Sequence, residues 1–223
     1  EGSVLTVSGG TEAYTLAVSH SQSTRTMRWL WAADSETLSL FGSMITPEVQ
    51  DQFSQSAGSA VEVNAGCFII VRSGVLDEEC KPHYDFFSPH LPRAAAFTMM
   101  TPMSEAHPSC VGGLEYWPWS GPDRAVKDSE TAFRTDARSL PLEVLDYHHG
   151  LATVIDGRIL HRTQPYGRGD SCGAPLGPLT AAIASGDLRV LLCVNVSRTT
   201  SESWPHLERL LQRQLGLGFV RCS

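Results

Sequence analysis

The chain has 223 residues, of which 42% are hydrophobic and 18% are charged. This apolar fraction is typical of a globular protein and disfavours disorder, and no apolar run approaches the roughly 20 residues that a membrane-spanning helix needs. Lys and Arg number 17 against 24 Asp and Glu, so the net charge is −7. Bulk charge therefore disfavours nucleic acid as a partner and favours a small molecule or a peptide.

Six cysteines, at positions 67, 80, 110, 172, 193 and 222, are too few for a disulfide scaffold, and none forms a Cys-x-x-Cys pair. We expect mostly free thiols, with Cys67 and Cys193 buried as small hydrophobes inside apolar strand-like runs. The chain begins at Glu1 without a Met or a basic and apolar leader, which predicts a processed or shortened form. The compartment stays open, with an intracellular one favoured.

The first half of the chain shows mainly the period-2 alternation of strands. It predicts strands over 14–18, 27–31, 61–63, 67–71, 94–100 and 114–117. One helix interrupts them, because Thr46 is a good cap, Pro47 suits the first helical position and Gly58 is a stop signal.

The second half combines strands with long polar segments. Residues 121–139 are polar and charged and predict a loop, whereas Asp156-Gly157 between two apolar runs predicts a tight β-hairpin of strands 151–155 and 158–163. A Gly- and Pro-rich loop follows over 165–187, with one helical turn at 179–184. A strand over 189–197 and an amphipathic closing helix over 204–215 complete the pattern. The fold class that we predict is mainly β with flanking helices.

Three side chains have the spacing of a metal site. In an extended segment, residues i and i+2 point to the same side, so His83 and Asp85 can converge on one ion while Tyr84 points away. His161 lies 76 residues after Asp85, on another predicted strand. Two imidazoles and one carboxylate can hold one face of an octahedral Fe(II) and leave three positions open. We therefore predict His83, Asp85 and His161 as metal ligands and as the centre of catalysis.

These residues belong to a longer ordered set. It consists of His83-Tyr84-Asp85-Phe86-Phe87, Gly112-Gly113-Leu114-Glu115, the run from Asp156 to His161 and the run from Arg189 to Asn195. In this set the chain resembles the Fe(II)/2-oxoglutarate-dependent dioxygenase superfamily, and within it the prolyl-4-hydroxylase-like and algal TET-like branch. The resemblance covers about residues 61–198, which we interpret as the core of one domain over 1–223.

The resemblance implies a double-stranded β-helix, or jelly roll, with Fe(II) as cofactor, 2-oxoglutarate as co-substrate and ascorbate as a candidate reductant. It also implies a basic residue that pairs with the 5-carboxylate of 2-oxoglutarate. Arg189 is our choice, because it opens the strand after the distal His and shares a face with Cys193 and Asn195. Its planar guanidinium suits a carboxylate. The 28-residue interval from His161 leaves Arg168 and Arg198 as alternatives.

The activity that the resemblance implies is oxidation of a substrate, with hydroxylation of a peptide or small molecule as the default and succinate and CO2 as co-products. Two alternatives stay open: a non-catalytic jelly-roll module that binds a sugar or peptide, and an oxygenase of modified nucleic-acid bases. We expect Thr163 and Asn195 to orient the ligands through hydrogen bonds. The segments 118–140 and 164–187 are expected to cover the metal as lids.

Overall fold

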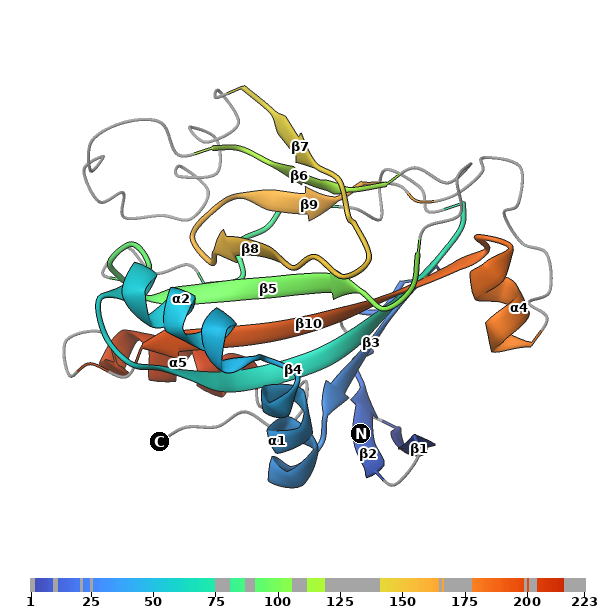
Figure 1. Ribbon diagram of the computed structural model, residues 1–223, viewed down its shortest axis with the longest axis horizontal. Coiled ribbons are helices and arrows are strands. Elements are labelled where there is room, and N and C mark those ends of the chain that lie inside the picture. The colour runs from blue at the N-terminus through green and yellow to red at the C-terminus, as the bar shows by residue number, and fades with distance from the viewer. Residues whose placement is uncertain are drawn as a thin grey trace.

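The computed structural model describes residues 3–9, 12–20, 22–24, 26–74, 81–86, 91–105, 112–118, 141–164, 166, 178–198, 200 and 204–214. Its strands form two antiparallel sheets, which Figure 1 shows as two layers. Among the helices in these ranges, none is long and apolar enough to cross a membrane.

The larger sheet contains seven of the described strands. Their order is β1 (Val4–Gly9), β2 (Glu12–Val18), β3 (Met27–Ala32), β4 (Val61–Arg72), β10 (Leu188–Arg198), β5 (Ala96–Pro102) and β8 (Thr153–Asp156). The smaller sheet has the order β7 (Glu143–Leu145), β6 (Leu114–Tyr116) and β9 (His161–Thr163). Four strands of the larger sheet, β4, β10, β5 and β8, thus face the smaller sheet as a jelly roll, and β3, β2 and β1 extend the larger sheet on one side (Figure 1). The predicted fold class is confirmed.

The predicted helix at 46–58 is α2 (Pro47–Ala57), capped by the Thr46 hydroxyl and ended by Gly58 in the left-handed conformation. A helix that the sequence analysis did not predict, α1 (Ser35–Ser43), precedes it. Its cap is Asp34, which accepts a hydrogen bond from the backbone of Thr37. The alternating run from Thr37 to Leu40 resembles a strand, and this local pattern hides the helix.

The other two described helices lie where the sequence analysis placed them. They are α4 (Leu179–Ala184) and α5 (Trp204–Gln214). On α5, Leu207 and Leu211 are fully buried and pack in the core between the sheets. Residue 215 and the loop at 121–139 lie outside the described residues, as do large parts of 165–187.

The central strand β10 separates two apolar clusters, as its alternation predicts. Leu192 and Val194 point to the outer face and pack with Phe41 of α1 and Phe53 of α2. Leu191 and Cys193 point between the sheets. Since helices cover the outer face, the inner face with its polar residues is left to line a cavity.

Two strand predictions need correction. The runs at 61–63 and 67–71 are parts of one continuous strand, β4. The predicted hairpin around Asp156-Gly157 is wrong, because β8 pairs with β5 of the larger sheet whereas β9 pairs with β6 of the smaller one. The turn carries the chain from one sheet to the other. Gly157 is needed there because a Cβ atom would lie 2.5 Å from Cδ2 of the buried Phe86.

Candidate metal centre

A single backbone bridge brings the two histidines together. The N–H of His83 donates to the carbonyl of His161 at 2.9 Å, and the N–H of His161 donates back to the carbonyl of His83 at 3.1 Å. Residues that exchange both hydrogen bonds in an antiparallel pair lie directly opposite each other, with side chains on the same face. The two imidazole centroids are accordingly 4.5 Å apart.

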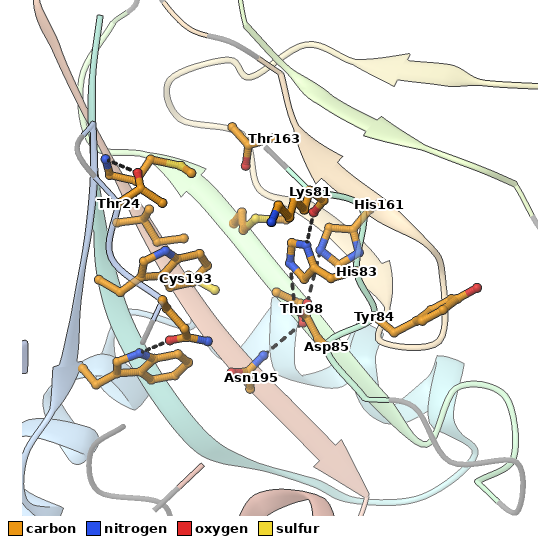
Figure 2. Close-up of a pocket in the computed structure, with 16 residues that line it drawn as sticks. Thr24, Lys81, His83, Tyr84, Asp85, Thr98, His161, Thr163, Cys193 and Asn195 are labelled. Atoms are coloured by element: carbon orange, nitrogen blue, oxygen red, sulfur yellow. Dashed lines mark hydrogen bonds and ion pairs between the residues drawn. The ribbon is translucent and has the colours of Figure 1, made fainter. Parts of the chain in front are cut away.

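Asp85 completes the cluster. The distance from His83 Nε2 to Asp85 Oδ1 is 3.6 Å, and the distance from His161 Nε2 to Asp85 Oδ2 is 3.5 Å. One ligand atom from each residue lies within 4.8 Å of the other two. Figure 2 shows both imidazoles directed toward the carboxylate, while the ring of Tyr84 points away from it. The structure thus brings together the three residues that the sequence analysis proposed as metal ligands.

Backbone carbonyls fix the histidine tautomers. His83 Nδ1 lies 2.9 Å from the carbonyl oxygen of Lys81, and His161 Nδ1 lies 2.9 Å from that of Ile159. A carbonyl only accepts hydrogen bonds, so each Nδ1 carries the hydrogen and each neutral imidazole has a lone pair on Nε2. Two lone pairs and a carboxylate therefore converge on one point, an arrangement that a cation stabilises.

Two polar residues of the sheet floor orient Asp85. Thr98 on β5 donates from Oγ1 to Asp85 Oδ2 at 2.5 Å, and Asn195 on β10 donates from Nδ2 to Thr98 Oγ1 at 3.0 Å (Figure 2). Thr98 and Asn195 are direct register partners in neighbouring strands, and both are buried. Asn195 was expected to orient a ligand, and it does so through Thr98, which the sequence analysis did not single out. A hydroxyl residue within the apolar run of β5 was the available signal.

The three candidate ligands differ in how far their side chains are exposed. The side chain of His161 is 4% exposed, that of Asp85 17% and that of His83 41%. Burial lowers the pKa of His161 below its usual value of 6.5, against the opposing effect of the Asp85 charge. The neutral imidazole, which is the form that can bind a metal, is therefore favoured at His161.

The cluster lies at one side of a cavity of about 670 Å³ between the sheets. The volume is in the range of sites for drug-sized molecules. Besides the three candidate ligands, the described lining residues are Gln22, Thr24, Met27, Trp29, Trp31, Ile69, Lys81, Tyr84, Thr98, Met100, Thr163, Cys193 and Asn195. Thr163 therefore lines the cavity. Cys67 and Cys193 are free and buried, as predicted.

Arg189 is buried, at 4% exposure, on the inner face of β10. Its guanidinium lies over the rings of Tyr147 and Tyr166, with 4.9 Å and 4.3 Å from Cζ to the ring centroids, and Nη1 donates to the carbonyl of Gly112 at 2.5 Å. Arg189 is not itself among the described lining residues. Tyr147 in turn donates from its hydroxyl to Sδ of Met100, a lining residue of the cavity, at 3.5 Å.

The alternatives to Arg189 are placed differently. Arg198, at the other end of β10, donates from Nη1 to the carbonyl of Ala57 at the end of α2, at 3.2 Å. It is therefore directed to the helix layer and is not among the described lining residues. Arg168 lies outside the described residues. The sequence analysis did not identify Tyr147, because its contact with Arg189 joins distant segments that no local pattern links.

No family model and no curated protein matches the sequence. Among solved structures, AviO1 from Streptomyces viridochromogenes Tue57 matches with a TM-score of 0.50 at 15% identity, over 89% of this chain and 74% of that chain. SnoN, described as a non-heme alpha ketoglutarate dependent epimerase from nogalamycin biosynthesis, matches with a TM-score of 0.51 at 15% identity, over 89% and 68%. HygX from Streptomyces hygroscopicus, solved with nickel, 2-oxoglutarate and hygromycin B, has a TM-score of 0.49 at 11% identity, over 88% and 74%.

At this level of identity the similarity concerns the fold. The narrower placement in the prolyl-4-hydroxylase-like and algal TET-like branch gains no support from these matches and stays a prediction. The expected fold is supported, because the chain matches an alpha ketoglutarate dependent enzyme over 89% of this chain with a TM-score of 0.51. The chain therefore shares its jelly-roll fold with SnoN, an alpha ketoglutarate dependent epimerase.

Proposed function

We propose that the protein is a non-haem Fe(II)- and 2-oxoglutarate-dependent oxygenase. The observation that carries this proposal is the cluster of His83, Asp85 and His161, in which both Nε2 lone pairs face one carboxylate. This donor set is the 2-His-1-carboxylate arrangement that holds iron with open positions. The fold that the chain shares with SnoN adds support.

The geometry of the donors fits one divalent ion. Bonds of about 2.1 Å from a metal to an imidazole nitrogen or a carboxylate oxygen place neighbouring ligand atoms about 3 Å apart. The two N···O distances, 3.6 Å and 3.5 Å, need only small side-chain rotations to reach that value. Without a cation, the carboxylate and the two lone pairs would repel one another.

The candidate site for 2-oxoglutarate runs from the triad toward Arg189. A buried guanidinium favours a carboxylate, because an anion compensates the charge that burial desolvates. Cys193 and Thr163 line the cavity, and both side chains are small. In this proposal Arg189 pairs with the 5-carboxylate, and the other end of the co-substrate lies at the ion.

When bound, Fe(II) and 2-oxoglutarate supply dioxygen activation, with oxidation of the co-substrate to succinate and CO2 and oxidation of a substrate C–H bond. The chain's own residues bind and orient. Thr98 and Asn195 hold the Asp85 carboxylate, and the carbonyls of residues 81 and 159 hold the two imidazoles. The apolar side chains of the larger sheet that line the cavity exclude water. Hydroxylation of a small molecule or a peptide is the outcome we propose.

A succinate assay tests the proposal. The protein is loaded anaerobically with Fe(II), exposed to air with 2-oxoglutarate, and supplied with panels of small molecules, peptides and nucleic-acid bases. Succinate should form with the wild type and with Asp146→Asn, a control at an exposed carboxylate, but not with Asp85→Asn. If the iron-loaded wild type forms no succinate with or without added compounds, the chain is a jelly-roll binding module and the proposal fails.

A further inference from the structure

We propose that the cavity recognises the flat ring system of a neutral aromatic small molecule, which stacks on Trp29 at the side opposite the triad. This inference rests on the proposed function, because it names the substrate class of the same site. Trp29 and Trp31 both line the cavity and come from β3, a strand beyond the four of the jelly roll that face the smaller sheet. The added strand therefore contributes a wall that the jelly roll alone does not have.

The sheet register places this wall in line with the metal centre. Trp31 pairs with Cys67, Cys67 with Cys193, and Cys193 with Met100, so these residues form one row across β3, β4, β10 and β5. Two residues further along β10, the next pair of residues that face the cavity is Asn195 with Thr98 on β5. This pair holds Asp85 through the Thr98 hydroxyl. Three strand spacings of about 4.8 Å separate β3 from β5, or about 14 Å. A molecule that spans this floor contacts the indoles and the triad together.

The two indoles present a stacking surface. Their ring centroids are 6.0 Å apart and their planes differ by 13°, so they are stacked along the strand. Trp31 is buried, at 3% exposure, while Trp29 is partly exposed. A flat ring in the cavity can extend the stack at Trp29, and such contacts strengthen binding beyond the effect of buried area alone.

The polar groups of this wall favour an aromatic ligand over a sugar. Gln22 Oε1 accepts from Trp31 Nε1 at 2.8 Å, and Thr24 Oγ1 accepts from the backbone N–H of Met27 at 3.1 Å. Each of these oxygens thus already accepts one hydrogen bond from its own wall, whereas a sugar needs several groups to satisfy its hydroxyls. Met27 and Ile69 complete this side with apolar surface.

The charges on the described lining residues argue for a neutral ring system. The carboxylate of Asp85 and the ammonium of Lys81 both belong to the segment that carries His83 and Asp85. The β3 side contributes no charged group among the described lining residues. A charge on the ring system would lose hydration there without gaining a partner, which is costly.

A binding experiment on the wild-type protein tests this directly. The Zn(II)-loaded protein is titrated with 2-naphthol, with trans-2-decalol, its saturated counterpart, and with maltose, while the indole N–H signals are followed by NMR. We expect 2-naphthol to shift the signals of Trp29 and Trp31 and to leave those of Trp117 and Trp204 in place. The saturated alcohol should bind at least about 3-fold more weakly, because it lacks a π-face.

Substitutions add a second measurement. Trp29→Leu should raise the dissociation constant of 2-naphthol about 3- to 10-fold, and Trp29→Phe should restore most of the affinity. Trp117→Leu is the matched control, because Trp117 is partly buried but is not among the described lining residues. The wild-type titration stands even if Trp29→Leu does not fold.

The outcomes separate the two proposals. If 2-naphthol leaves both indoles unshifted, if the decalol binds equally well, or if maltose binds more tightly, the aromatic substrate class is refuted. Zn(II) binding and succinate formation in the same preparations report on the metal centre independently. Loss of those two with preserved 2-naphthol binding would refute the proposed function and leave the aromatic site as a binding module.

Discussion

The hydroxyl of Thr98 should control the affinity of the metal centre. Thr98→Val keeps the shape of the side chain but removes the hydrogen bond of 2.5 Å to Asp85 Oδ2. It also removes the acceptor of the Asn195 amide, which is buried. The carboxylate is then free to rotate. Metal binding must therefore also immobilise it, and this loss of entropy weakens the binding.

The expected magnitude follows from both losses. Removing a group that orients a metal ligand typically weakens metal binding about 10- to 100-fold, or about 1.4–2.7 kcal/mol. The buried amide of Asn195 left without this acceptor should lower the free energy of unfolding by about 1–3 kcal/mol. The two effects are separable, because the second is present in the metal-free protein.

The assay is calorimetric titration of the metal-free protein with Fe(II) under anaerobic conditions, with thermal unfolding in parallel. Thr101→Val is the matched control on the same strand, since the Thr101 hydroxyl donates to the carbonyl of Leu151 at the surface. Thr98→Val should weaken iron binding and Thr101→Val should not. Equal dissociation constants for the two variants and the wild type would refute the role of Thr98.

Three further predictions concern the co-substrate, the sheet crossing and pH. Arg189→Met should raise the dissociation constant of 2-oxoglutarate about ten-fold or more, since a charged hydrogen bond is worth about 1.5–3 kcal/mol; an unchanged constant by calorimetry would exclude Arg189 as the anchor. Gly157→Ala should destabilise the protein by about 1–3 kcal/mol in urea unfolding, because the added Cβ would lie 2.5 Å from a ring atom of Phe86. Gly42→Ala, in α1, would place its Cβ no closer than 3.9 Å to another atom and should instead stabilise the protein by about 0.5–1 kcal/mol. A Gly157→Ala protein more stable than Gly42→Ala would contradict the packing argument. The metal-free protein should lose stability as pH falls below about 6.5, because burial lowers the pKa of His161 in the folded state and protonation then favours the unfolded chain; a pH-independent melting temperature between pH values of about 7.5 and 5.5 would contradict this.

Local patterns predicted most elements, because the physics that forms them is local. The alternation of β10 placed Cys193 inside and Val194 outside, and the Thr46 cap placed α2. The hairpin prediction at Asp156-Gly157 failed because the same dipeptide also suits a turn between two sheets. The choice depends on which partner strands are available, here β5 and β6, and those pairings are long-range.

The site was predictable to the extent that it depends on residue type and spacing. His83 and Asp85 stand at i and i+2, and His161 lies on another predicted strand that could supply the third ligand. Thr98 and Trp29 were not predicted, because their roles arise from strand register across the larger sheet. That register pairs Thr98 with Asn195, 97 residues further along the chain, and Trp29 with Ile69, 40 residues further. Such pairings leave no trace in either segment alone.

Iron stoichiometry in His161 variants tests the central claim most directly. The wild type, His161→Ala and His148→Ala are equilibrated with Fe(II) without oxygen, dialysed and measured for bound iron. His148 is exposed, directly before the turn at residues 149–150 and outside the cluster, and serves as the matched control. We expect one iron per chain in the wild type and in His148→Ala, and loss of that iron in His161→Ala. Equal iron content in all three proteins would contradict the proposal that His83, Asp85 and His161 hold the metal.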